Sequence, residues 1–285
     1  MKQKLLVLCG GQSSEHIVSR MSCTSVLNNL NKDKYELTLV GITTDGKWYY
    51  LDQKQTDLAK DSWLDNSRPV EDVYGLLKSQ DVALPVLHGL YGEDGTIQGL
   101  FELTQLPYVG CRVLGSSVAM DKIYTKKILD TVGIPQVKSV YVKKRYDDKL
   151  VVVDQNFDEI SNVEEYIGEQ IGFPCFIKAS RSGSSVGCYR CDKQSDLMAK
   201  LMEAGKYDRH IVVEECIDCI ELETAVLGND DVIVSRVGQI MPHGEFYTLE
   251  SKYEDEESKP CIPPLVDEKL REQIRQYAIK VFHAV

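Results

Sequence analysis

The sequence has no apolar run long enough to cross a membrane and no broad cluster of basic residues. A membrane-spanning helix needs about 20 mostly apolar residues, so we expect no membrane partner. The formal net charge of −11 excludes a wide positive face for nucleic-acid phosphates. The apolar run near the start, residues 5–9, is too short for a secretory signal and runs into glycine. This start therefore predicts a buried strand in a cytoplasmic protein.

A disulfide framework is also missing, because the nine cysteines are odd in number and mostly lie in apolar or scattered positions. The exception is two Cys-x-x-Cys pairs, Cys188 with Cys191 and Cys216 with Cys219, whose spacing suits a zinc ribbon. Residues three apart on a strand point to opposite faces, and no glycine follows either pair. We interpret these thiols as packing residues, with a zinc-ribbon interaction module as the alternative.

Internal repeats and low-complexity segments are absent as well, and 285 residues suffice for two or three domains. Strands, loops and helices alternate up to about residue 131, which predicts a small parallel sheet with a site at the carboxyl ends of its strands. The expected strands are 5–9, 35–42, 47–50 and 82–87. A first helix is expected to begin at Ser13 or Ser14, either of which can cap it, and further helices are expected over 96–104, 116–119 and 122–131.

From residue 136 the pattern changes to hairpins and strands, which predicts a second domain of the α+β class. Its expected strands are 139–143, 174–178, 187–191, 211–215 and 221–227, and its expected helices are 161–171, 195–204 and 267–284.

The most informative segment is residues 178–187, Lys-Ala-Ser-Arg-Ser-Gly-Ser-Ser-Val-Gly. Lys178 closes an apolar strand and supplies a compact positive charge. Gly183 and Gly187 let the backbone approach an anion closely, and the serines add hydroxyl donors. The spacing is not that of a Walker P-loop. The segment favours a triphosphate site, and a serine- and glycine-rich hairpin beside a surface lysine is the alternative.

Six blocks of sequence carry a resemblance to a known family and follow one another in that family's order: residues 10–19, 85–89 with 92–99, 120–122, 178–187, 213–215 with 221 and 225–228, and 246–253. Together they resemble the D-alanine–D-alanine ligases, an ATP-grasp family that includes the vancomycin-resistance ligases. The resemblance covers nearly the whole chain. It implies an ATP-grasp fold, α/β and α+β, with a Rossmann-like substrate-binding domain at 1–120. A central subdomain at 121–212 would carry the phosphate loop, and an incomplete C-terminal subdomain would occupy 213–285.

The resemblance also implies roles near the amino-acid substrate. Glu15 is expected to hold the ammonium group of the first D-alanine, which is compatible with a place beside a helix N-terminus. His88, at the end of an apolar strand, matches a family histidine near the substrate, and a structural role is the alternative. Ser184, flanked by Ser185, is expected to link Glu15 to Tyr253, so that the substrate is held and the loop closes.

For ATP, the resemblance implies phosphate contacts from Lys122, Lys178 and Lys252, which suit phosphoryl transfer. The alternatives are a solvated helix lysine at 122 and a surface ion pair at 252. Glu214 matches a position in the family's hinge that binds adenine, and Glu221 matches the acidic residue that binds the ribose. The full ATP-binding set is Lys122, Lys178, Ser184, Ser185, Glu214, Glu215, Glu221 and Lys252.

The implied reaction is ATP-dependent ligation of D-alanine to a second D-amino acid through an acyl phosphate, for peptidoglycan precursors. Water must be kept from the intermediate, so the glycine-rich loop and the segment around Tyr253 are expected to act as lids. Tyr253 favours a dipeptide product over a D-lactate ester. Residues 41–49 resemble the D-alanine–D-serine resistance ligases, which leaves the acceptor open between D-alanine and D-serine. Family members are typically dimers, so a homodimer is expected.

Three departures from the family pattern bear on activity. Ala179 replaces a usual proline, and Asp218-Cys219 replaces a glycine-containing turn. The family continues past a helix like 267–284 with the ligands of two Mg²⁺ ions, which are absent from this chain, so we assign no metal ligand. We expect this 285-residue form to ligate poorly. The alternatives are another ATP-grasp carboxylate–amine ligase or a non-catalytic nucleotide-binding remnant.

Overall fold

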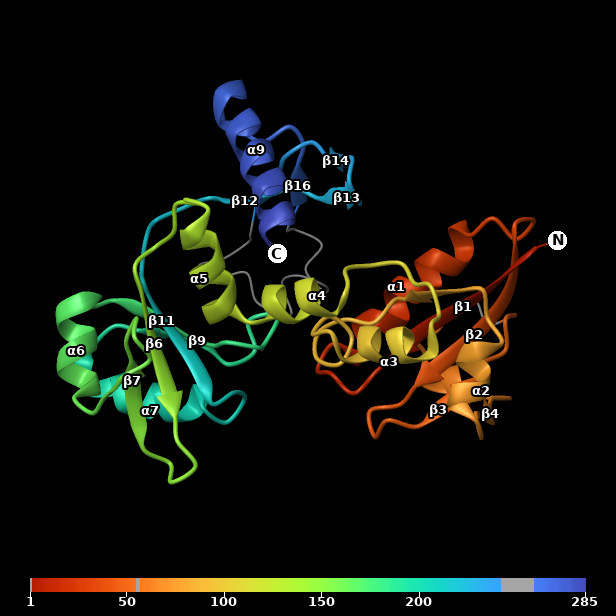
Figure 1. Ribbon diagram of the computed structural model, residues 1–285, viewed down its shortest axis with the longest axis horizontal. Helices are drawn as coiled ribbons and strands as arrows, with labels where there is room; N and C mark the ends of the chain where they lie inside the picture. The colour runs from red at the N-terminus through yellow and green to blue at the C-terminus, as the bar shows by residue number, and fades with distance from the viewer. Residues whose placement is uncertain (1, 55–56, 242–258) are drawn as a thin grey trace. The chain divides into compact units, whose positions relative to one another are not determined.

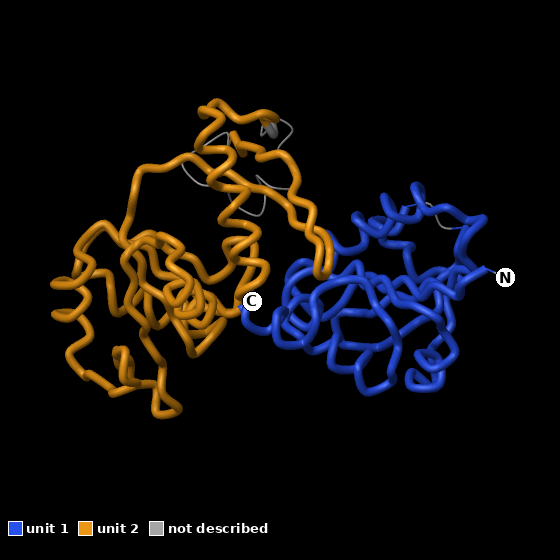
Figure 2. The backbone as a smooth tube through the Cα atoms, turned by 45° about the horizontal axis from the view of Figure 1, so that its top comes forward, with its two compact units in different colours: residues 1–120 blue, residues 121–285 orange. Residues whose placement is uncertain are grey.

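The computed structural model describes residues 2–54, 57–241 and 259–285. The chain forms two compact units, Met1–Met120 and Asp121–Val285, shown in different colours in Figure 2. Among the described residues, no helix combines the length and the apolar character that crossing a membrane requires.

The first unit is built on a five-stranded sheet with the order β4-β3-β2-β1-β5 (Figure 1). Strands β1 (Gln3–Gly10), β2 (Tyr35–Ile42) and β5 (Val82–Pro85) are parallel, as the alternating pattern predicts. Strands β3 (Trp48–Tyr50) and β4 (Arg68–Pro69) extend one edge in the antiparallel sense. The remaining elements are α1 (His16–Asn29), η1 (Asp61–Leu64), α2 (Val73–Lys78), α3 (Thr96–Thr104) and α4 (Val113–Met120).

Helices cover both faces of this sheet, because β1 carries apolar side chains on each. Leu5, Val7 and Cys9 pack in one cluster with Cys23 and Leu27 of α1. Leu6 and Leu8 pack in another with Ile97 and Phe101 of α3. A strand that is buried on both faces has a continuous apolar run in its sequence, which is why residues 5–9 predict this strand well.

The second unit contains a six-stranded antiparallel sheet with the order β10-β9-β11-β6-β7-β8. Its strands are β6 (Ser139–Lys144), β7 (Leu150–Val153), β8 (Glu159–Ile160), β9 (Cys175–Ala179), β10 (Cys188–Cys191) and β11 (His210–Glu215). Helices α6 (Val163–Gln170) and α7 (Gln194–Ala204) pack on one face of this sheet. The helix α5 (Lys122–Thr131) contacts β11.

Two small sheets and a helix complete the second unit. Strands β12 (Glu221–Glu223), β15 (Gly238–Met241) and β16 (Lys259–Cys261) form one sheet, and β13 (Val226–Gly228) with β14 (Val232–Val234) forms the other. The single strand expected over 221–227 is therefore wrong, because the chain crosses from one sheet to another within it. Helix α9 (Glu268–Ala284) contacts β13, β14 and α5.

Candidate functional site

In the first unit, the expected amino-acid site lies at the carboxyl ends of β1 and β5. The hydroxyl of Ser13 donates to the backbone oxygen of His88 at 2.6 Å and accepts from the backbone N–H of Glu15 at 3.1 Å. Gly89 has a φ of +67°, and a side chain there would collide with the Glu15 carboxylate. The structure thus brings Glu15 and His88, which are far apart in sequence, to one place.

Two serines of α1 stabilise this arrangement, and sequence reasoning missed both. The Ser19 hydroxyl accepts from the backbone N–H of Gly10 at 2.8 Å and donates to the backbone oxygen of Val86. The Ser22 hydroxyl lies 3.0 Å from Nε2 of His88. The expected capping by Ser13 or Ser14 is wrong, because Glu15 holds the N-cap position of α1 and Ser13 bridges the two loops instead.

In the second unit, Lys178 and Glu214 face away from the core that α6 and α7 cover. Successive strand residues alternate between faces, and Ile177 and Val213 are the members of that core. The Nζ of Lys178 lies 2.5 Å from Oε2 of Glu214. The Nζ of Lys126, on α5, lies 2.8 Å from Oε1 of the same carboxylate. Burial opposes ionisation of Glu214, but the two lysines outweigh it and hold its pKa below the ordinary value.

Lys122, the first residue of α5, points at the phosphate loop. Its Nζ donates to the backbone oxygens of Ser180 at 3.2 Å and Ser182 at 2.5 Å. Burial lowers the pKa of Lys122, and the positive charge of Lys178 lowers it further. Lys122 and Lys178, two of the three lysines expected to contact phosphates, are therefore close enough to repel one another. An anion placed between them would relieve that repulsion.

The backbone of the loop itself adopts left-handed conformations. Ser184, Ser185 and Gly187 have φ values of 48°, 62° and 69°. Consecutive turns of this kind point backbone N–H groups into a concavity that suits an anion. Gly187 is required, because a Cβ there would lie 2.9 Å from the Cβ of Ala179. Gly183 is not among the residues with positive φ, and its expected close approach to an anion stays a prediction.

A buried polar cluster fixes the start of α5 against the loop. Asp121 is the N-cap and accepts from the backbone N–H groups of Ile123 at 3.1 Å and Tyr124 at 3.3 Å. The Ser180 hydroxyl donates to the same carboxylate at 2.6 Å. Lys122 is held next to the loop because the residue before it is hydrogen-bonded to the loop's own serine.

The structure does not bring all the expected ATP-binding residues together. The Glu215 carboxylate accepts from the backbone N–H of Lys138 at 2.7 Å and so joins β11 to the chain before β6. Glu221 is exposed on β12, in a different sheet. Lys252 and Tyr253 lie outside the described residues. Their roles, and the link from Ser184 to Glu15 and Tyr253, stay predictions.

The Cys-x-x-Cys pairs form no metal site in the part of the chain that the structure describes, where no three His, Cys, Asp or Glu side chains are grouped to hold an ion. Cys191 is buried opposite Cys175 on β9, which confirms its packing role. Cys188 instead lies opposite Lys178. Cys219 is exposed, so the packing interpretation is wrong for this thiol.

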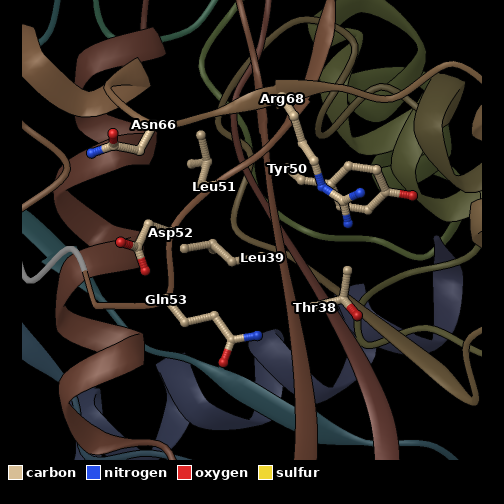
Figure 3. Close-up of a pocket in the computed structure, with 8 residues that line it drawn as sticks. All are labelled: Thr38, Leu39, Tyr50, Leu51, Asp52, Gln53, Asn66 and Arg68. Carbon is tan, nitrogen blue, oxygen red and sulfur yellow. The ribbon is translucent and has the colours of Figure 1, made fainter.

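A separate depression of about 380 Å³ lies on the first unit beside β2 and β3 (Figure 3). Its lining includes Thr38, Leu39 and Tyr50, and the guanidinium of Arg68 stacks 4.5 Å from the centre of the Tyr50 ring. Thr38 is paired with Leu6, in the middle of the parallel strands. This depression is therefore distinct from the Glu15 and His88 site at the carboxyl ends of the strands.

A loop with left-handed residues on an antiparallel sheet, beside lysines from a strand and a helix, is the arrangement expected of the ATP-grasp fold. Solved structures agree in fold along almost the whole chain. The chain is similar to VanG D-Ala:D-Ser ligase from Enterococcus faecalis, with a TM-score of 0.83 and 32% identity over 100% of this chain and 83% of that one. It is equally similar to the D-alanine-D-alanine ligase from Coxiella burnetii, with a TM-score of 0.83 and 32% identity over 99% of this chain and 77% of that one.

The chain belongs to the D-alanine–D-alanine ligase family. The family model for the ligase N-terminus matches residues 4–111, and the model for the C-terminus matches residues 128–285. The D-alanine–D-alanine ligase of Acetivibrio thermocellus is 42% identical over 100% of this chain and 80% of its own length. D-alanine–D-alanine ligase B of Clostridium tetani is 43% identical over 99% of this chain and 76% of its own length.

Proposed function

We propose that the protein ligates D-alanine to a second D-amino acid at the expense of ATP, as a step in peptidoglycan precursor synthesis. The observation that carries this proposal is the grouping of Lys122 and Lys178 at a loop with successive left-handed residues. Such a site binds the phosphates of ATP and offsets the negative charge that develops during phosphoryl transfer. Membership of the ligase family supports the same reaction.

The amino-acid end of the reaction is assigned to the first unit. Glu15 carries the negative charge that an α-ammonium group needs, and His88 lies in the loop joined to it through Ser13. The carboxylate of the first D-alanine attacks the terminal phosphorus of ATP and forms an acyl phosphate. The amine of the second D-amino acid then attacks the carbonyl carbon, the C–O bond breaks, and phosphate leaves.

A magnesium requirement is implied by the family, but no described residues offer a group of carboxylates that fits the ion. We therefore route no step through a metal. The chain's own lysines bind and orient the phosphates, and the loop after β9 covers them. Glu215, Glu221, Ser184, Ser185, Tyr253 and Lys252 keep the roles that the resemblance implies.

D-Alanine is the proposed acceptor, because the relatives at 42% and 43% identity are D-alanine–D-alanine ligases. D-Serine is the second candidate, supported by similarity to the D-Ala:D-Ser ligase of E. faecalis. We further propose a cytoplasmic homodimer, and a division of the second unit into subdomains at 121–212 and 213–285.

The test is phosphate release from ATP with D-alanine alone, with D-alanine plus D-serine, and with L-alanine. We expect release that depends on D-alanine, and a Glu15→Gln variant that loses at least about 100-fold in kcat/KM for D-alanine because its carboxylate charge is gone. Glu93→Gln, a neutralisation in the loop after β5, is the matched control and should retain wild-type rates. Equal rates for the Glu15→Gln variant and the wild type would contradict the assignment of Glu15.

A further inference from the structure

We propose that Lys126 is a positioning residue for ATP: it holds the Glu214 carboxylate, so that Glu214 orients Lys178 toward the phosphates without cancelling the charge of Lys178. This inference rests on the proposed function, because it assigns a residue to the same nucleotide site. In the sequence, Lys126 lies in a short basic cluster with Lys122 and Lys127, and no motif assigns it a role.

The geometry places one carboxylate between two ammonium groups. Lys126 binds Oε1 of Glu214 at 2.8 Å, and Lys178 binds Oε2 at 2.5 Å. The oxygens are different, so the two lysines do not compete for one position. The carboxylate side chain is 10% exposed and Lys126 is 17% exposed, whereas Lys178 is 30% exposed. The more accessible of the two ammonium groups is thus the one assigned to the ligand.

Helix α5 supplies both contacts from one face. Lys122 and Lys126 are four residues apart, which places them one above the other on a helix. Lys122 reaches the carbonyls of the phosphate loop, and Lys126 reaches Glu214 on β11. The N-cap of Asp121 and its bond to Ser180 fix the start of this helix. A single rigid element therefore sets the positions of two cations relative to Lys178.

The charge count explains why the second lysine matters. Glu214 paired with Lys178 alone would form a neutral pair, and little positive charge would remain for a phosphate. With Lys126 present, two ammonium groups share one carboxylate and the group carries a charge of +1. Together with Lys122 this gives +2 beside the loop. Removal of Lys126 would leave a buried carboxylate with one partner, which binds Lys178 more strongly and withdraws it from the nucleotide.

Lys127 provides a matched control for the loss of one positive charge. It is the next residue on α5, and its Nζ lies 4.5 Å from the centre of the Phe157 ring. Lys127→Met removes the same charge from the same helix and leaves the ion pair between residues 126 and 214 in place. A general electrostatic effect would change nucleotide affinity equally in the Lys126→Met and Lys127→Met variants, whereas a positioning role would not.

The experiment is calorimetric titration of ADP and of adenosine into the full chain and its variants. We expect Lys126→Met to weaken ADP binding by about tenfold or more. Adenosine affinity should fall by less, because the backbone at 215–217 shares the expected adenine contact with Glu214. Lys127→Met should bind both ligands like the wild type, and Lys126→Arg should recover most of the ADP affinity. In steady-state assays, the KM for ATP should rise in Lys126→Met while the KM for D-alanine stays constant.

A second comparison keeps the inference testable if Lys126→Met does not fold. In a Glu214→Gln background the carboxylate charge is gone, so the further change of Lys126 to Met should cause no additional loss of ADP affinity. Equal ADP affinities for the Lys126→Met and Lys127→Met variants, or fully additive losses in the double variant, would overturn the inference. Wild-type ADP binding without turnover of D-alanine would instead overturn the proposed reaction, and absence of ADP binding by the wild type would overturn both.

Discussion

At the scale of single residues, the proposed nucleotide site contains buried charges of both signs that compensate one another. Glu214 lies between two lysines, and Asp208 is a second buried carboxylate that is held by several donors. Nε and Nη2 of Arg181 donate to the Asp208 carboxylate at 3.0 and 2.9 Å, and the backbone N–H groups of Arg181 and His210 donate to it as well. Burial opposes ionisation of Asp208, but these donors outweigh it and hold its pKa below the ordinary value.

The lowered pKa of Asp208 predicts a pH-dependent contribution to stability. A carboxyl group with a depressed pKa in the folded state stabilises that state above its unfolded pKa, and the contribution is lost as pH falls through the folded pKa. Asp208→Asn should lower the free energy of unfolding by about 1 to 3 kcal/mol at pH 7, and the difference from the wild type should shrink on acidification. Urea denaturation at several pH values measures this.

Asp147→Asn is the control, because the Asp147 side chain is 46% exposed and pairs with Lys149 at the surface. Its free energy of unfolding should stay close to that of the wild type at every pH, because solvent screens an exposed ion pair. A loss for Asp208→Asn that stays constant from pH 7 into the acid range would contradict the role assigned to its charge.

At the scale of elements, the sequence predicts the strands and helices whose pattern is local and leaves out what depends on distant partners. Strand β2 agrees with its expected bounds, because its apolar run ends at a recognisable turn. The break between β12 and β13 could not be predicted, since it depends on the sheets that each half joins. Lys178 and Glu214 could be assigned from their motifs, whereas the contact from Lys126 requires α5 to be packed against β11.

The loop after β9 gives a prediction that separates backbone strain from steric collision. Gly187 and Gly133 have similar φ values, 69° and 67°. A Cβ added at Gly187 would lie 2.9 Å from the Cβ of Ala179, whereas a Cβ added at Gly133 would have no atom within 4 Å. Gly133→Ala should cost about 1 kcal/mol of stability through backbone strain alone. Gly187→Ala should cost at least about 1 kcal/mol more and should weaken ADP binding. Thermal denaturation with ADP titration provides the measurement, and equal stability losses would contradict the packing described for the loop.

At the scale of the whole molecule, the proposed function assigns a different part of one reaction to each of the two units. The first unit presents a carboxylate and a histidine at the carboxyl ends of parallel strands. The second presents cationic side chains and a loop that suits phosphate, on the face of an antiparallel sheet that α6 and α7 leave free. Similar chains with TM-scores of 0.83 show the same fold, and the family models match both units.

The measurement that tests the account most directly follows oxygen from the amino acid to phosphate. The protein is supplied with ATP and with D-alanine that carries ¹⁸O in its carboxylate, and the mass of the released phosphate is determined. A carboxylate that attacks ATP and is then displaced by an amine gives up one of its oxygens, so we predict phosphate containing a single ¹⁸O, released with the dipeptide. Unlabelled phosphate, or phosphate release that does not depend on D-alanine, would contradict the account.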